Sequence, residues 1–270
     1  MANVLGIIRN KASGVAGAVD LFIDNVKQTQ YKKCELLEYM TEFKSKSTLP
    51  YSFAYGDAVV YNGEIHLFGS SVSGNETKHY KWNGNSWTSV STLPYSLSNG
   101  GAVVYNNAIH ILGSYVSENQ KKHYKWNGNS WTNVSTLPYN FNSGGAVVYN
   151  NEIHLLGSYV SGNYTKHYRW NGSSWASVST LPYNFYFGRA VVYNNEIHLL
   201  GSYATGNETK HYKWNGNSWT SVSTLPYNFY GGRTVVYNNA INLLGGSVSR
   251  DKHYYFSRGT GKRYKAIFSS

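Results

Sequence analysis

The chain has 270 residues, of which 41% are hydrophobic and 16% aromatic, and its formal net charge is +11 at pH 7. This length allows one large domain with a small appendage. A single cysteine, Cys34, excludes a framework of disulfides within one chain, so nothing in the sequence indicates an oxidising compartment. The positive charge favours anionic partners or surfaces and carries no information about the fold.

Residues 1–33 are expected to form a docking segment, with a short apolar strand over residues 4–8 and an amphipathic helix that begins near Ser13. The helix is predicted from apolar residues spaced as one helical stripe: Val15, Val19, Phe22, Ile23 and Val26. Such a stripe either docks onto a partner or covers one end of the domain that follows. Because Arg9 and Asp20 interrupt the apolar run, we expect neither a secretory signal nor a membrane span.

A repeat fills most of the remaining chain. The tripeptide Leu-Pro-Tyr recurs at a fixed step of 44 residues, with its leucine at Leu49, Leu93, Leu137, Leu181 and Leu225. Within each copy the hydrophobic residues alternate with period 2 and turn residues separate the runs, as in antiparallel strands. In the fourth copy we predict strands a to d at residues 189–194, 196–202, 210–214 and 219–224, with an Asn-Gly hairpin between c and d. Four strands per copy at this period are typical of β-propeller blades.

Several features of the copies resemble the kelch repeat over residues 47–256. They are an arginine before strand a at Arg189 and Arg233, the run Ile-His-Leu-Leu-Gly in strand b, a tyrosine in strand c and a tryptophan at the start of strand d. The resemblance implies an all-β fold, a kelch-like β-propeller of five four-stranded blades, with six blades as the alternative. The paired glycine that the family has after strand b is kept only at residues 245–246, and the other copies have Gly-Ser.

The N-terminal part of the repeat region is expected to close the ring. Phe43 has the register of the tryptophan that opens strand d in the other copies, so residues 34–46 are expected to supply a strand d. The fifth copy ends after its strand c, at residue 256, without the second tryptophan and the Leu-Pro-Tyr. Pairing the two closes the ring and covers an exposed sheet edge. The predicted domains are therefore a docking segment, 1–33, and a propeller closed by an N-terminal strand, 34–270.

The recurring tryptophans and histidines are expected to be structural. The two tryptophans that flank each c–d hairpin are predicted to pack against each other or between blades. Because the fifth copy has Asn242 in strand b, the histidines at this position are predicted to be hydrogen-bonded rather than metal ligands: His66, His110, His154 and His198. The strand c histidines are expected on the outer surface of the blades: His79, His123, His167, His211 and His253. We expect no metal and no cofactor.

The copies differ mainly in two loops, the connection from strand d to the next strand a and the loop between strands b and c. Antiparallel strands ordered a to d from the axis outward bring both loops to one face, and loops on a rigid scaffold are where binding residues concentrate. The loop residues predicted to contact a ligand are Tyr55, Tyr115, Phe141, Tyr159, Tyr186, Phe187, Arg189, Tyr203, Tyr230 and Arg233. The alternatives are neutral drift of exposed loops and, for Arg189, a structural bond between blades.

The repeats contain neither a distinctive pair of carboxylates nor a nucleophile with an oriented base, so we expect a binding module and no enzyme. Aromatic loops and a basic balance suit a host-surface glycan or an anionic wall polymer. No nucleic-acid motif is present, so nucleic acid is not an expected partner. The organisation resembles a bacteriophage tail fibre or receptor-binding protein, which implies a virion location and binding of other virion proteins through the N-terminal segment. The alternative is a cytoplasmic kelch-type scaffold that binds a protein partner.

Overall fold

The structure is a computed structural model that describes residues 21–23, 26–28, 47–248 and 250–257. The chain divides into two compact units, Met1–Thr48 and Leu49–Ser270. The predicted domain boundary after residue 33 and the predicted closing strand at 34–46 lie outside the described residues. Within the described ranges, no helix is long and apolar enough to cross a membrane.

The first unit contains a β-hairpin where we predicted a helix. Strand β1 (Leu21–Ile23) pairs antiparallel with β2 (Val26–Gln28), with Phe22 opposite Lys27 and Ile23 opposite Val26. The predicted helix is therefore wrong over these residues, while Val15 and Val19 lie outside the described ones. The physical reason is in the sequence, because β-branched and aromatic residues favour strands. Asp24 and Asn25 between them are residue types that favour tight turns.

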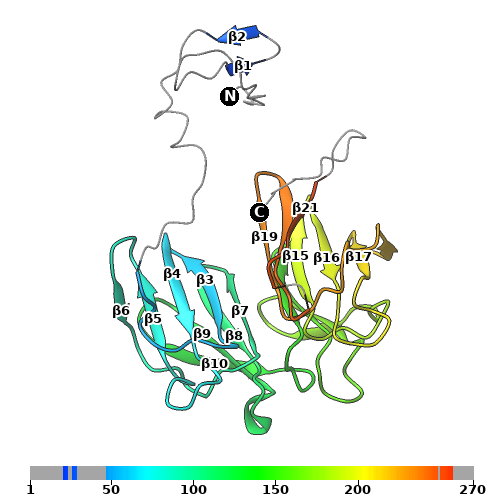
Figure 1. Cartoon of the computed structure of the whole chain (residues 1–270). Coiled ribbons are helices and arrows are strands. Elements are labelled where there is room, and N and C mark those ends of the chain that lie inside the picture. Colours follow the sequence, from blue (N-terminus) through cyan, green and yellow to red (C-terminus); the bar gives the residue numbers. More distant parts are fainter. Residues whose placement is uncertain (1–20, 24–25, 29–46, 249, 258–270) are drawn as a thin grey trace. The chain divides into compact units, whose positions relative to one another are not determined.

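The second unit is an all-β propeller of five blades (Figure 1). Blade 1 comprises β3 (Asp57–Tyr61), β4 (Glu64–Phe68), β5 (His79–Trp82) and β6 (Trp87–Ser89). Blade 2 comprises β7 (Gly101–Tyr105), β8 (Ala108–Leu112), β9 (Lys122–Trp126) and β10 (Trp131–Thr136), with a short 3-10 turn, η1 (Ser117–Asn119), between β8 and β9. Blade 3 comprises β11 (Gly145–Tyr149), β12 (Glu152–Leu156), β13 (His167–Trp170) and β14 (Trp175–Ser177).

Blade 4 comprises β15 (Arg189–Tyr193), β16 (Glu196–Leu200), β17 (His211–Trp214) and β18 (Trp219–Ser221), and the described part of blade 5 comprises β19 (Arg233–Tyr237), β20 (Ala240–Leu244) and β21 (His253–Phe256). The strands of each blade are antiparallel and hydrogen-bonded in chain order. The predicted strands of the fourth copy are confirmed, each within a few residues at its ends. Strand d is shorter than predicted.

Neighbouring blades pack through their faces. The innermost strands contact each other in the order β3, β7, β11, β15, β19, and a hydrophobic cluster fills each space between consecutive blades. Between blades 3 and 4, for example, Tyr149 and Leu156 of blade 3 pack with Phe185, Ile197 and Trp214 from the blade 4 side. The tryptophan pairs pack across their hairpins as predicted, with ring centroids 5.3–5.5 Å apart.

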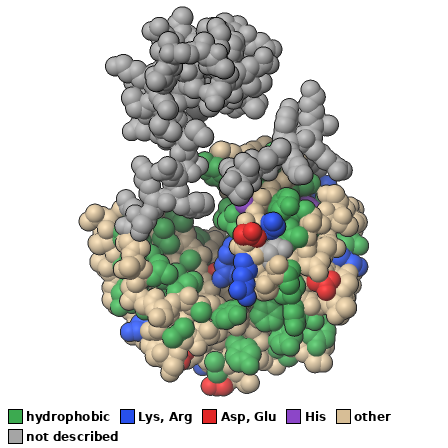
Figure 2. All heavy atoms as spheres, in the orientation of Figure 1, with side chains coloured by type: hydrophobic (Ala, Val, Ile, Leu, Met, Phe, Trp, Pro, Cys, Tyr) green, Lys and Arg blue, Asp and Glu red, His purple; other side chains and the backbone are tan. Residues whose placement is uncertain are grey.

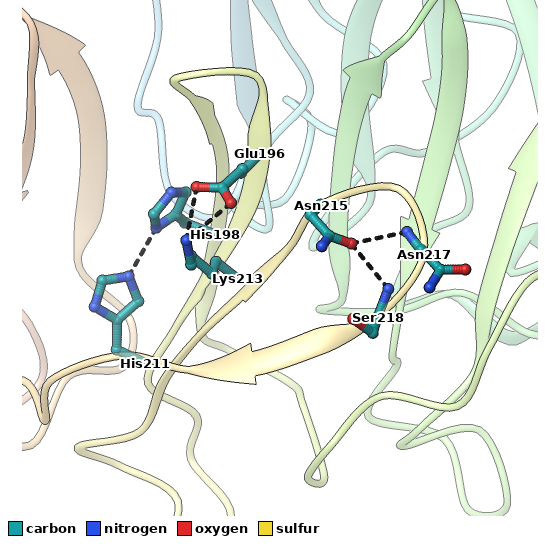
Figure 3. Close-up of polar contacts among 7 residues, drawn as sticks. All are labelled: Glu196, His198, His211, Lys213, Asn215, Asn217 and Ser218. Carbon is teal, nitrogen blue, oxygen red and sulfur yellow. Dashed lines mark hydrogen bonds and ion pairs between the residues drawn. The ribbon is translucent and has the colours of Figure 1, made fainter.

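The strand b histidines are buried and hydrogen-bonded, as predicted, but their partners are the strand c histidines. In blade 4, Nδ1 of His198 lies 2.8 Å from Nε2 of His211 (Figure 3). Equivalent pairs join the two strands in blades 1 to 3, and in blade 5 Asn242 Oδ1 takes the histidine's place opposite His253 Nε2. The predicted surface position is therefore wrong for His79, His123, His167 and His211, because each is covered by a tryptophan or, for His211, by Phe256 of the next blade. Only His253 is exposed, as expected.

The two ends of the blade series expose surfaces that are buried in the middle blades. Ile65 of blade 1 is 41% exposed and Tyr237 of blade 5 is 63% exposed, whereas their counterparts Ile197 and Tyr193 are buried. In Figure 1, β3–β6 of blade 1 lie at the left of the view and β19–β21 of blade 5 lie nearer the centre. Among the described residues, hydrophobic clusters fill the four spaces between consecutive blades, and none joins blade 5 to blade 1.

Candidate ligand-binding face

The two variable loops of each blade lie on the same face, as predicted, because they are hydrogen-bonded to each other. The N–H of Tyr203, in the b–c loop of blade 4, donates to the carbonyl oxygen of Tyr186, in the d–a connection, at 3.0 Å. In blade 5, the N–H of Ser247 donates to the carbonyl oxygen of Tyr230 at 2.9 Å. Side chains from both loops therefore project from one surface, which we call the loop face.

The serine of each Gly-Ser dipeptide anchors the d–a connection. The hydroxyl of Ser158 is fully buried and donates to the backbone carbonyl oxygens of Asn140, at 2.8 Å, and Asn142, at 3.2 Å, as alternative acceptors. It also accepts from the N–H of Asn142 at 3.0 Å. The preceding glycine is required by close packing, since a Cβ on Gly201 would collide with the carbonyl oxygen of Phe229. The departure from the paired glycine of the kelch pattern thus has a structural role.

One residue of each d–a connection adopts the left-handed backbone conformation, and these residues form a chain of hydrogen bonds from blade to blade. In blades 2 to 5 this residue donates its N–H to the carbonyl oxygen of its counterpart in the preceding blade at 2.7–2.8 Å. The five residues are Tyr55, Asn99, Ser143, Phe187 and Gly231. A positive φ is unfavourable for large side chains, so tyrosine and phenylalanine here carry strain of roughly 1–3 kcal/mol each. Strain that the surrounding structure enforces often marks a functional position.

Six aromatic side chains form a continuous cluster on the loop face, which we call the aromatic patch. They come from four loops of blades 3, 4 and 5: Tyr159, Tyr164, Tyr186, Phe187, Tyr203 and Tyr230. Tyr186 is central, with its ring centroid 5.1 Å from that of Tyr159 and 5.4 Å from that of Tyr164. Tyr203 continues the patch to Tyr230 at 5.0 Å. Tyr159 and Tyr203 keep 45% and 52% of their surface exposed, so the patch offers aromatic faces to a ligand.

The hydroxyl group of Tyr186, at the centre of the aromatic patch, is neutral at physiological pH. Burial and the neighbouring Tyr164, Tyr159, Tyr203 and Glu208 raise the pKa of the Tyr186 hydroxyl above its usual value, so this group stays protonated. The tyrosine hydroxyl groups of the patch can act as hydrogen-bond donors and acceptors. The patch combines apolar ring faces with polar edges.

Five of the predicted ligand contacts thus meet in the patch, and the other five have different positions. Phe141 is a correction, because it is 0% exposed and packs in the core between blades 2 and 3. The sequence holds the signal for this, since Leu97, Phe185 and Phe229 are apolar at the same position and equally buried. Tyr55 and Tyr115 are exposed, but among the described residues neither has an aromatic ring contact.

The two predicted arginines both bond to one carbonyl group. Arg189 donates from Nε to the carbonyl oxygen of Gly232 in the next blade at 2.8 Å, which is the structural bond that we kept as the alternative. Arg233 donates to the same oxygen at 3.2 Å and lines a shallow cavity of about 250 Å³ with Arg250. Figure 2 shows basic side chains next to an extensive hydrophobic area on the visible face.

Two residues of this face were missed in the sequence. Tyr164 lies in a variable loop and is the one aromatic residue at its position, where blades 1, 2 and 4 have Glu76, Gln120 and Glu208. Arg250 lies in the b–c loop of blade 5, which is two residues shorter than in the other copies. Both signals were present as differences between copies. Among the described residues, no group of three or more His, Cys, Asp or Glu side chains could hold a metal ion.

Comparisons with known proteins support the fold alone. No protein-family model and no curated protein sequence matches the chain. A solved structure titled "Structure of YjhT" is similar, with a TM-score of 0.65 and 14% sequence identity, over 77% of this chain and 82% of that chain. At this identity the similarity concerns backbone architecture, and side chains that differ between the two proteins decide what each one binds.

Proposed function

We propose that this propeller is a non-enzymatic binding module that recognises a glycan through the aromatic patch. The observation that carries the proposal is that six aromatic rings from four separate loops are in mutual contact while two of them stay half exposed. An exposed cluster of this kind on a soluble scaffold marks an interaction site. Tyrosine is suited to it, because its rigid ring gives a large contact area and its hydroxyl bonds to polar groups.

A glycan fits this surface better than an apolar ligand. The C–H face of a sugar ring loses contact with water when it lies on an aromatic ring, and the sugar hydroxyls find partners in the tyrosine hydroxyls and loop amides. Among the described residues, the cavity on this face is shallow and open, unlike the enclosed apolar pocket that holds a drug-sized molecule. Contact with an extended polymer therefore suits the geometry, and weak single sites gain strength when several copies act together.

The proposed setting is a phage virion. The organisation of the chain, with a separate N-terminal unit before a ring of near-identical blades, resembles tail fibre and receptor-binding proteins of phages. In this proposal residues 1–33 attach the chain to other virion proteins, and the ligand is a host-surface glycan or an anionic wall polymer. The residues that resemble the kelch repeat are consistent with a propeller that holds such loops on a rigid scaffold.

The test is a binding survey of the full chain against purified surface polysaccharides and wall polymers. We expect one class of polymer to bind, and Tyr186→Ala to weaken it by about tenfold, as for a contact that contributes 1–2 kcal/mol. Lys213→Ala is the control, because this lysine pairs with Glu196 on the outer part of blade 4 and lies outside the patch (Figure 3). Failure to bind any polymer, together with specific capture of one protein, would favour the scaffold function instead.

A further inference from the structure

Blade 5 carries a concentration of positive charge beside the aromatic patch. The cavity next to Tyr230 is lined by Arg233, Arg250 and Ser247, with the backbone of Gly231, Gly232 and Gly246 and part of Leu244. Tyr230 joins this cavity to the patch, because its ring contacts Tyr203 and its carbonyl oxygen accepts the N–H of Ser247. The cavity and the patch are therefore neighbours on one face.

The two arginines of this cavity form no ion pair with a carboxylate of the described residues. Among the described residues, the ion pairs involve Lys81, Arg169 and Lys213, and none involves Arg233 or Arg250. Two acids are nearby, Asp251 next to Arg250 in the chain and Asp57 at the start of β3. The Asp57 carboxylate accepts from the N–H groups of Ala58 and Ala102. Burial raises the pKa of this carboxyl group, while these two N–H groups and the charge of Arg233 lower it. Although the charge of Arg233 acts on Asp57, no hydrogen bond or ion pair among the described residues joins either guanidinium group to a carboxylate, so the N–H donors of both can bind another anion.

The bond between Arg233 and Gly232 fixes one guanidinium in place. It uses one of the five N–H donors of the side chain, and the planar group leaves the others for a ligand. Glycine residues at 231, 232 and 246 bring no side chains into the cavity, so a ligand can approach the backbone closely. Arginine binds carboxylate and phosphate oxygens with two parallel hydrogen bonds, which makes it the preferred residue for such groups.

We propose that the Arg233–Arg250 cavity is an oxyanion site that binds a carboxylate or phosphate group of the ligand. This deepens the proposed function, on which its biological meaning rests: the patch holds the sugar rings, and the cavity selects polymers that carry an acidic group. The asymmetry of the chain favours this assignment. The residues that correspond to Arg233 in blades 1 to 3 are Asp57, Gly101 and Gly145, and the corresponding Arg189 of blade 4 is bonded to Gly232. The pair Arg233 and Arg250 lines the cavity at the blade 5 end of the patch.

The direct test uses inorganic phosphate and the full chain at low ionic strength. We expect the NMR signals of the Arg233 and Arg250 Nε–H groups to shift and saturate with phosphate, and Arg250→Gln to weaken this binding at least fivefold. Lys125→Gln is the matched control, since it removes the same charge from an exposed lysine of β9 in blade 2. Phosphate shifts that do not saturate, or an equal loss in Lys125→Gln, would show general attraction to a basic protein and overturn the site.

A second experiment separates this site from the proposed function. A uronic-acid oligosaccharide and its carboxyl-reduced counterpart differ only in the acidic group, and a phosphorylated oligosaccharide shows which acid is preferred. We expect Arg233→Gln and Arg250→Gln to weaken the acidic ligands about tenfold and to leave the neutral one within twofold. Equal losses for acidic and neutral ligands would contradict the oxyanion site. Saturable phosphate binding without any carbohydrate binding would overturn the proposed function and leave the site standing.

Discussion

Phe187 combines a strained backbone with a place in the aromatic patch. Its φ of 54° is unfavourable for a large side chain, and its ring contacts Tyr159 and Tyr203. Blade 2 has Asn99 at the same position, a residue type that tolerates this conformation. We interpret this strained phenylalanine as a contact for the proposed ligand.

Phe187→Asn tests this interpretation. We expect the free energy of unfolding to change by less than about 1 kcal/mol, because relief of backbone strain offsets the lost ring contacts. Glycan affinity should fall by about tenfold. Urea unfolding and a binding titration measure the two quantities. Phe187→Val is the comparison, since a β-branched residue at positive φ should be the more destabilising change. Severe destabilisation by Phe187→Asn would assign the ring to the fold.

In blades 1 to 4, the strand b histidine and the strand c histidine form a buried pair. Each pair is buried between two blades, and burial lowers the pKa of His123, His167 and His211 to about 3 and of His154 to about 4, with the paired histidine or a nearby cation adding to the effect. These side chains are therefore neutral in the folded protein at pH 7. A neutral pair needs one ring nitrogen to donate and the other to accept, so protonation of both breaks the bond.

The sign of the resulting pH dependence follows from the lowered pKa values. Unfolded histidines take up protons below about pH 6.5, and the folded ones do not until about pH 3–4. Stability is therefore fully present above pH 6.5 and is lost as the pH falls through this window, by up to about 1.4 kcal/mol per pH unit for each histidine. We expect cooperative unfolding well above pH 3 in a circular-dichroism titration. A free energy of unfolding that stays constant between pH 6.5 and pH 4 would contradict the buried pairs.

The sequence predicted the strands of the blades well, but it predicted poorly which residues of different strands and blades are in contact. The Leu-Pro-Tyr step and the alternating runs located every strand of blade 4, because strand periodicity and turn residues are local signals. His211 is hydrogen-bonded to a histidine of another strand and packs against Phe256 of another blade. No local sequence pattern therefore indicates that His211 is buried. The hairpin β1–β2 was missed because a few apolar residues satisfy both a helical and an alternating pattern.

The sequence predicted where the loop face lies, but only half of the residues that we predicted to contact a ligand lie in the aromatic patch. Strand order and direction alone bring the d–a and b–c loops together, which the bond between Tyr203 and Tyr186 confirms. The direction of a side chain in an irregular loop depends on the backbone angles of that loop. The sequence did not indicate these angles for Phe141 or Phe187. Comparison of the copies gave the better guide, because a position that is apolar in all five is core and one that varies is exposed.

For the whole molecule, the main question is how the series of blades ends. Blade 5 exposes Tyr237 and Leu244, and blade 1 exposes Leu49 and Ile65, although the same positions are buried wherever two blades meet. Among the described residues no strand pairs with the outer edge of β21. Exposed apolar faces and free strand edges promote aggregation. The closing strand at residues 34–46 lies outside the described residues and stays a prediction.

Deletion of residues 34–46 tests this closure. We expect the shortened chain to aggregate and to lose several degrees in melting temperature, because a sheet edge and apolar side chains stay uncovered. Deletion of residues 1–33 is the control, and it should give a monodisperse protein with an unchanged melting temperature. Sedimentation and thermal unfolding measure both. Equal behaviour of the two shortened chains would show that residues 34–46 have no closing role.

The measurement that tests the proposed glycan-binding function most directly compares one loop position in two blades. Tyr203 and Tyr115 are equivalent residues and both are exposed, but only Tyr203 lies in the aromatic patch. In a titration with the bound polysaccharide, we predict that Tyr203→Ala raises the dissociation constant about tenfold and that Tyr115→Ala raises it less than twofold. Equal effects of the two substitutions, or a larger effect of Tyr115→Ala, would contradict binding through the aromatic patch.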